Sequence, residues 1–135
     1  MKIRLFLFTL LSFAVFAYAQ TANPSTAENY IYSKTCLDEN CIKKSEQVQY
    51  FDDLGRSKQL IGIKATPLGK DLVTPVQYDE FGRTTRQYLP VPQSGTQNGA
   101  IYTDPLNNAI AVFGNEKIYT EQEIENSPAG RIKKI

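Results

Sequence analysis

FDDLGR at residues 51–56 returns as YDEFGR at residues 78–83, and this repeat decides the fold. The two copies stand 27 positions apart. Asp at the first position of a type I turn bonds to the backbone ahead of it, and Gly at the fourth position tolerates a positive φ. Each copy therefore predicts a β-hairpin turn. The positions that carry the motif are Phe51, Asp52, Gly55, Arg56, Tyr78, Asp79, Gly82 and Arg83.

Three further stretches have the same turn composition: TPLG at residues 66–69, DPLN at 104–107 and SPAG at 127–130. Pro presets φ at the second position of such a turn, so each stretch is also a hairpin candidate. Short runs of aromatic and β-branched residues, which are typical of strands, lie between the turns. These runs are residues 30–32, 48–51, 60–63, 72–78 and 88–89.

The spacing of the turns predicts an all-β fold. The first three turns begin 14 and 13 residues apart, which leaves room for one strand between each turn and the next. We therefore expect an antiparallel meander of hairpins over about residues 29–89. Residues 90–116 are rich in chain breakers, so the C-terminal third is expected to be irregular there. The apolar run at 109–113 fits either a helix or a strand, and residues 117–125 favour a strand.

The first 19 residues predict a cleavable signal peptide. Lys2 and Arg4 precede an apolar stretch at residues 5–16, and small residues stand just before a cleavage site between Ala19 and Gln20. An uncleaved anchor is the alternative, but the apolar stretch is shorter than the roughly 20 residues that a spanning helix needs. The sequence thus predicts an exported protein, located in the periplasm, on the outer surface or in the medium, with no membrane span after cleavage.

The charge of the exported chain gives no reason to expect nucleic acid or an acidic membrane as a partner. Cleavage would remove two of the 15 basic residues and none of the 14 acidic ones, which leaves a net charge of −1. Residues 20–28 are small and polar and are expected to form a flexible leader. One β-rich domain is then expected over residues 29–135.

Cys36 and Cys41 are the two cysteines of the chain, and they bracket a four-residue polar loop between two strand-like runs. If those runs pair, the two cysteines face each other across the end of a hairpin at a separation that suits a disulfide. An oxidising compartment would preserve this bond. Two free thiols are the alternative. A zinc site would need two more ligands, and the chain has no histidine.

The repeated motif resembles the YD repeats of bacterial RHS proteins, whose signature is an aromatic residue, Asp, two variable residues, Gly and Arg. Residues 49–56, 67–83 and 88–90 are similar to the domain of unknown function at the exported N-terminus of such proteins. This resemblance implies a strip of β-hairpins that belongs to a shell, which can enclose a C-terminal toxin or present an adhesive surface. The implied partners are the remainder of that shell, a surface protein or a glycan.

Length separates this chain from the proteins that it resembles. Members of that group usually have many hundreds of residues, whereas this chain has 135. The resemblance therefore implies a truncated copy, a gene fragment or the first piece of a split system. It implies neither a self-cleaving core nor a toxin domain within these residues.

The residue types present argue against an enzyme. The acidic pairs Asp52-Asp53 and Asp79-Glu80 could serve acid–base chemistry or bind calcium, but turn capping explains them more simply. Ser94 lacks the context of a nucleophile elbow, and Ser-His or Cys-His catalysis would need a histidine. No catalytic residue, cofactor or metal is therefore predicted. Arg56 and Arg83 could contact phosphate, but pairing with acids across strands is the simpler interpretation.

Seven tyrosines outside the signal peptide leave two functional hypotheses open. Tyrosine combines apolar area with a polar tip, so these residues would suit a sugar- or protein-binding face, or they could fill the packed face of the sheet. We favour packing, and with it an exported, non-enzymatic structural or interaction domain. The alternative is a free-standing module for glycans or proteins. The tyrosines are Tyr30, Tyr32, Tyr50, Tyr78, Tyr88, Tyr102 and Tyr119.

We predict that the exported protein begins at Gln20, because the alanines at positions 17 and 19 form the one well-placed site for signal peptidase. Intact-mass measurement of exported material should match residues 20–135. Material that retains Met1 would contradict this prediction.

Overall fold

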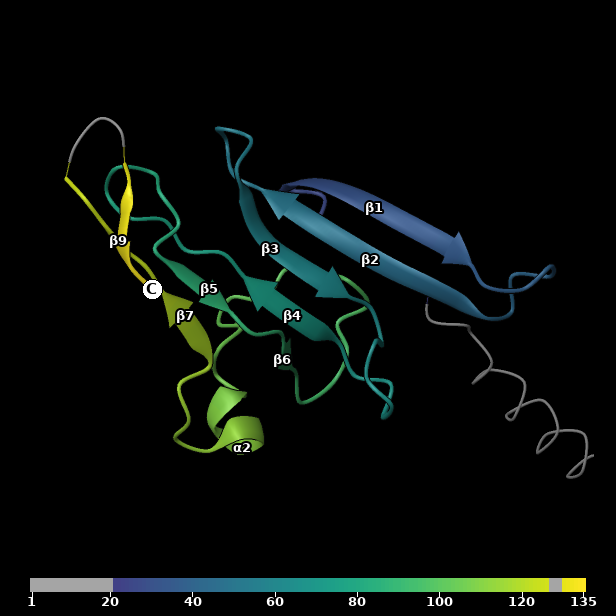
Figure 1. Cartoon of the computed structure of the whole chain (residues 1–135). Helices are drawn as coiled ribbons and strands as arrows, with labels where there is room; N and C mark the ends of the chain where they lie inside the picture. Colours follow the sequence, from purple (N-terminus) through teal and green to yellow (C-terminus); the bar gives the residue numbers. More distant parts are fainter. Residues whose placement is uncertain (1–20, 127–129) are drawn as a thin grey trace, which may run out of the picture.

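The regular structure of the chain is mostly a five-stranded antiparallel sheet with the order β1-β2-β3-β4-β6 (Figure 1). The computed structural model describes residues 21–126 and 130–135, so the predicted signal peptide and its cleavage site lie outside the described residues. This sheet confirms the all-β meander predicted from the turns. Its strands are β1 (Asn29–Cys36), β2 (Lys44–Phe51), β3 (Ser57–Gly62), β4 (Leu72–Pro75) and β6 (Val91–Pro92).

The C-terminal half adds two small antiparallel sheets and one short helix. The first sheet joins β5 to β7, and the second joins β8 to β9. Strands β7 and β8 confirm the strand expected within residues 117–125, whereas the apolar run at 109–113 is helical. The elements are β5 (Arg86–Tyr88), α2 (Ala109–Phe113), β7 (Tyr119–Glu121), β8 (Glu123–Ile124) and β9 (Ile132–Lys134).

The predicted turns do not all join paired strands. The turns at residues 52–55 and 66–69 connect neighbouring strands of the main sheet, and their glycines have φ values of 76° and 67°. The candidate at 104–107 is not a hairpin, so that prediction was wrong. The candidate contains no glycine at which the chain could reverse its direction, and the backbone continues through further turns into α2. Residues 127–129 of the fifth candidate lie outside the described part, although its flanking strands β8 and β9 do pair.

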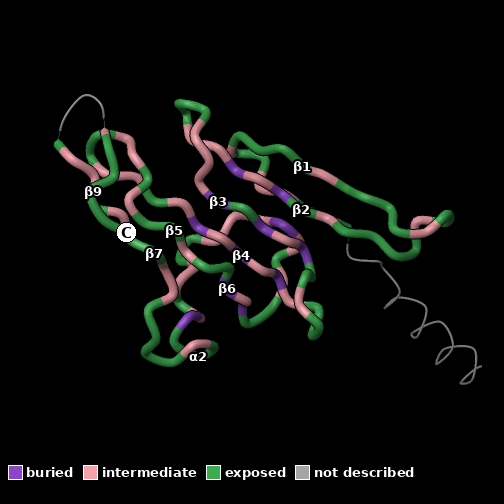
Figure 2. Tube along the Cα trace, viewed as in Figure 1, coloured by how far each residue is buried: buried purple, intermediate pink, exposed green. Residues whose placement is uncertain are grey.

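The core lies on one face of the main sheet. Alternate residues of β2, β3 and β4 point to this face, as the two-residue period of a strand requires. Figure 2 shows this buried band running across the middle of the sheet. Ala22, Ile101 and Tyr102 pack against it from segments that have no regular structure. The buried cluster consists of Val48, Tyr50, Ile61, Ile63 and Val73.

The segment expected as a flexible leader is instead bound to the core over its described residues 21–28. Its Ser25 amide donates to the hydroxyl of Tyr50 at 2.8 Å, and that hydroxyl donates to the Gly99 carbonyl at 2.6 Å. The Asn23 amide donates to the carbonyl of Asn98 at 2.7 Å. These bonds satisfy the polar tip of a tyrosine that is completely buried. Residues 21–28 therefore form part of the cover over the core.

The side chain of Asp71 holds the second part of that cover, residues 93–102, in place. This carboxylate is completely buried between the turn at 66–69 and β4. It accepts bonds from the amides of Lys64 and Gln97, both at 2.9 Å. The hydroxyls of Thr96 and Tyr102 donate to it at 2.7 and 2.9 Å. Four donors compensate for the lost hydration of one charge, so residues 93–102, predicted as irregular, form an ordered layer over the sheet.

Replacing Asp71 should destabilise the protein more than replacing an exposed Asp. Asp71→Asn turns one acceptor oxygen into a donor that faces two hydrogen-bond donors, at a cost of about 2 kcal/mol in the free energy of unfolding. Asp53→Asn is the matched control, because Asp53 is exposed and such surface changes usually stay within about 0.5 kcal/mol. Urea unfolding of both variants provides the measurement. Equal stabilities would show that the Asp71 bonds do not hold the cover.

Candidate functional site

The tip of the β1–β2 hairpin is closed by the predicted disulfide between Cys36 and Cys41, whose Cα atoms lie 4.7 Å apart. The carboxylate of Asp38 inside the loop accepts bonds from the amides of Ile42 and Lys43 at 2.7 and 2.9 Å. The disulfide and the Asp38 bonds order the tip of the β1–β2 hairpin. We call this hairpin the ribbon, and it extends beyond β3 (Figure 1). The disulfide prediction is thus confirmed.

The two repeat turns have the same geometry. Oδ1 of Asp52 accepts bonds from the amides of Leu54 and Arg56 at 3.0 and 2.8 Å. Oδ1 of Asp79 accepts the equivalent bonds at 2.9 and 2.8 Å. Both glycines have a positive φ, 76° at Gly55 and 74° at Gly82. The prediction of equivalent turns capped by aspartate is therefore confirmed.

Each repeat arginine pairs with the aspartate of its own turn. Nε of Arg56 lies 2.8 Å from Oδ2 of Asp52, and Nε of Arg83 lies 2.9 Å from Oδ2 of Asp79. The expected pairing with a neighbouring acid is therefore observed, and the acid is the capping aspartate itself, because the turn brings its first and fifth positions together. The backbone bond from the arginine amide, aided by its guanidinium, holds the pKa of each aspartate below its ordinary value despite the opposing desolvation.

The first turn also contacts the second. The guanidinium of Arg56 lies 4.5 Å from the ring centre of Tyr78, and the Tyr78 hydroxyl donates to the Ser57 carbonyl at 2.9 Å. Arg56 also occupies the space beside Gly82, where an added Cβ would come within 2.8 Å of Nη1. Stacking of a guanidinium on an aromatic face is favourable. The aromatic residue and the glycine of the second copy therefore form the surface against which the arginine of the first copy packs.

The second repeat turn contacts the strand pair β8 and β9. Nη1 of Arg83 donates to the carbonyl of Glu125 at 3.4 Å, just before the turn between β8 and β9. Arg131 after that turn pairs with Glu125 at 3.3 Å. Arg83 thus links the second repeat turn to β8, as Arg56 links the first repeat turn to the second.

A recess of about 290 Å³ lies beside the inner face of β1 and β2. Both Tyr30 and Tyr32 are 38% exposed there. The Tyr32 hydroxyl donates to Glu46, which raises the pKa of Tyr32 to about 12. Burial alone would raise the pKa of Glu46, but the bonds from Tyr32 and from Lys44, whose Nζ lies 2.9 Å away, lower it. The sequence analysis named Tyr30 and Tyr32 among the candidates for a binding face, but it did not predict their grouping with Lys44 and Glu46.

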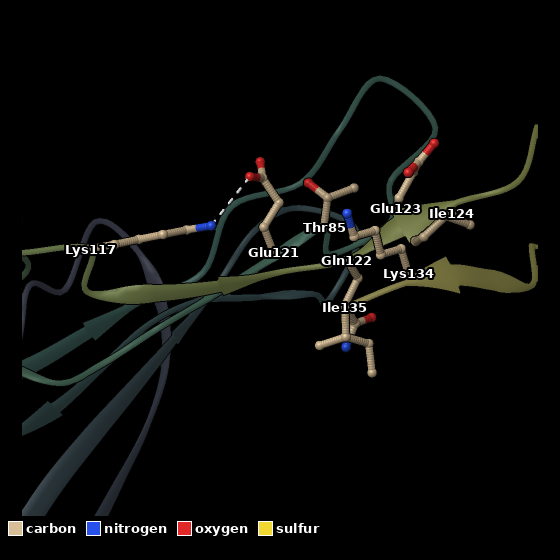
Figure 3. Close-up of a pocket in the computed structure, with 8 residues that line it drawn as sticks. All are labelled: Thr85, Lys117, Glu121, Gln122, Glu123, Ile124, Lys134 and Ile135. Atoms are coloured by element: carbon tan, nitrogen blue, oxygen red, sulfur yellow. Dashed lines mark ion pairs between the residues drawn. The ribbon is translucent and has the colours of Figure 1, made fainter.

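A second recess, about 620 Å³, lies between the two small sheets (Figure 3). Glu121 on its wall pairs with Arg86 at 2.8 Å and with Lys117 at 3.7 Å. The bond from Arg86 lowers the pKa of Glu121, so this carboxylate is held as an anion in an ion-pair network. The other residues that line the recess are Thr85, Gln122, Glu123, Ile124, Lys134 and Ile135.

The described residues contain neither a metal-binding cluster nor a membrane-spanning helix. Among residues 21–126 and 130–135, no three His, Cys, Asp or Glu side chains gather closely enough to hold a metal ion. No helix within these same ranges has the length and apolar character needed to cross a membrane.

Protonation of the turn aspartates should destabilise the protein. Because their folded pKa values are lowered, Asp52 and Asp79 contribute stability that is complete above their ordinary pKa of about 3.9 and is lost as the pH falls through the lowered values. The double variant Asp52→Asn/Asp79→Asn should therefore lose less unfolding free energy than the parent protein between about pH 6 and about pH 2.

The neighbouring acids provide a control in the same two turns. Asp53 and Glu80 are exposed, so Asp53→Asn/Glu80→Gln should keep the pH dependence of the parent protein. Urea unfolding across this pH range measures both double variants. An identical pH dependence for the two would contradict the assigned role of the capping aspartates.

Comparison with known proteins gives one match. The model of a protein family described as "Domain of unknown function (DUF6443)" matches residues 20–135, which is well over half of the chain. No curated protein and no solved structure matches. The extent of the family match decides the assignment: the chain belongs to the family that carries this domain of unknown function.

Proposed function

We propose that this chain is an exported, non-enzymatic structural or interaction domain, and that it forms the first section of a strip of β-hairpins like that of RHS/YD-repeat proteins. The contact of Arg56 with Tyr78 carries this proposal. In that contact one copy of the motif supplies the arginine and the next copy supplies the surface on which it lies. Repeats that contact only their neighbours in this way extend along one dimension.

The two repeat turns, residues 52–55 and 79–82, form a surface that we call the turn edge. This surface has the exposed apolar side chains that an interaction domain needs. The third residue of each repeat turn is apolar and exposed, 77% for Leu54 and 61% for Phe81. The turn itself requires only the aspartate and the glycine. The guanidinium of Arg83 lies 4.9 Å from the Phe81 ring centre, but most of the Leu54 and Phe81 surface stays exposed. Exposed apolar residues that gather on one edge are typical of surfaces that contact another protein.

Export rests on the N-terminal sequence and on two further observations. Residues 1–19 have the three zones of a signal peptide. The family match begins at Gln20, the first residue after the predicted cleavage site. The disulfide at the ribbon tip fits an oxidising compartment such as the periplasm, the cell surface or the medium.

The second candidate function is a free-standing module that binds a glycan or a surface protein. The exposure of Tyr30 and Tyr32 favours it, because residues that only filled the sheet face would be buried like Tyr50. For such a module the recess beside them, rather than the turn edge, is the working surface. Neither candidate uses nucleic acid or a cofactor.

The strip proposal predicts that residues 20–135 associate through the turn edge. Sedimentation velocity over a range of concentrations should show association, and Leu54→Ser/Phe81→Ser should weaken it. Leu68→Ser is the matched control, since Leu68 has the same position in the turn at 66–69, is 79% exposed, and lies at the opposite end of the strands. A compact monomer at every concentration would contradict the proposal and favour the free-standing module.

A further inference from the structure

We propose that the recess beside β1 and β2 binds an acidic saccharide, with one uronic acid ring against the tyrosines. We call it the Tyr32 recess. The inference goes beyond the proposed strip, because the recess lies on the inner face of the ribbon and not on the turn edge. The recess is lined by Thr21, Ala22, Pro24, Tyr30, Tyr32, Lys34, Lys44 and Glu46.

Strand register places the polar and aromatic side chains of the recess on one face. Tyr30 is opposite Tyr50, and Lys34 is opposite Glu46. Directly paired residues of an antiparallel sheet point to the same side, so these side chains continue the core face outward along the ribbon. Tyr50 is completely buried under the leader and residues 99–102, whereas the tyrosines of the edge strand β1 are only bordered by the leader.

Both exposed rings are held in place before any ligand binds. The Tyr30 ring packs at 5.9 Å from the Tyr50 ring with an interplanar angle of 52°, and the Tyr32 hydroxyl is bonded to Glu46. A fixed aromatic side chain offers apolar area at a low cost in conformational entropy. Sugar rings have apolar C–H faces together with hydroxyl edges, so exposed rings next to polar groups suit them.

The charges in the recess favour an anionic ligand. Lys44 forms an ion pair with Glu46, whose side chain is only 13% exposed. Lys34 forms no ion pair among the described residues, although it faces Glu46 in the strand register. Two lysines and one glutamate leave one positive charge in excess. An ammonium group beside an aromatic platform is available for the carboxylate of a uronic acid through a charge-assisted bond.

The size of the recess suits one sugar ring. Its volume of about 290 Å³ lies at the lower limit of the roughly 300–1,000 Å³ range of small-molecule sites. The remaining sugars of a longer chain would run along the inner face of the ribbon. The excess of one positive charge beside the tyrosines favours an acidic sugar over a neutral one, so we commit to an acidic one.

The binding test uses disulfide-bonded protein comprising residues 20–135. Tetrasaccharides of galacturonate, glucuronate and mannuronate are titrated by calorimetry, and each is compared with the same tetrasaccharide after reduction of its carboxyl groups to alcohols. We expect at least one acidic tetrasaccharide to bind about tenfold more tightly than its reduced form. Equal binding of acidic and reduced forms, or no binding of any acidic tetrasaccharide at millimolar concentration, would overturn the proposal. Binding of a poly-glutamate peptide alone would also overturn it and indicate a protein partner.

Matched variants assign the contacts. Lys34→Gln should weaken acidic-sugar binding about tenfold, whereas Lys43→Gln, a lysine of the same hairpin that does not line the recess, should have no effect. Tyr32→Ala should abolish binding, and Tyr32→Phe, which keeps the ring, should retain most of it. Dispersed amide NMR spectra verify that each variant is folded. Equal losses for Lys34→Gln and Lys43→Gln, or for both Tyr32 variants, would contradict the assigned contacts.

Discussion

The burial of Asp71 is the constraint on which the rest of the structure depends. A five-stranded sheet with an apolar face needs a second layer, and this chain provides it mainly from segments without regular structure. Three of the four hydrogen bonds at Asp71, those from Thr96, Gln97 and Tyr102, hold residues 93–102 against that face. Burial and the bond to this carboxylate also raise the pKa of Tyr102 above its ordinary range, so the hydroxyl stays protonated as a donor. Once the layer is in place, Tyr50 can bond to Gly99 and the leader can bond to Tyr50.

The turns were predictable because their chemistry is local. Asp, Gly and Arg within five residues determine the cap, the positive φ and the ion pair, whatever the rest of the chain does. The cover of the core was not predictable in this way. Tyr50 and Gly99 are 49 positions apart, and Asp71 and Tyr102 are 31 apart. A polar residue that is buried by such distant partners has the same local pattern as one in an exposed turn, so the sequence did not reveal that residues 21–28 contact the core.

The tyrosines show a second limit of sequence patterns. Tyr30, Tyr32 and Tyr50 all lie in β-branched and aromatic runs, and strand alternation places them on one face. Their exposure differs because the covering segments lie over β2 and β3 and only border the edge strand β1. Tyr50 is packed completely, whereas Tyr30 packs its ring against Tyr50 and yet, like Tyr32, stays 38% exposed. The candidate site consequently arises from tertiary arrangement, and no motif in the sequence marks it.

The two repeat copies are alike in sequence but unlike in what constrains them. At Gly55 the space where a Cβ would stand is empty, so only the positive φ calls for glycine. At Gly82 the same φ is joined by the guanidinium of Arg56, which fills that space. Arg56 reaches toward the second repeat copy, whereas Arg83 lies over Phe81 of its own turn and donates to the carbonyl of Glu125. In the proposed strip, a contact of this kind would join each copy to the next, so that identical local motifs form an ordered row rather than a set of independent hairpins.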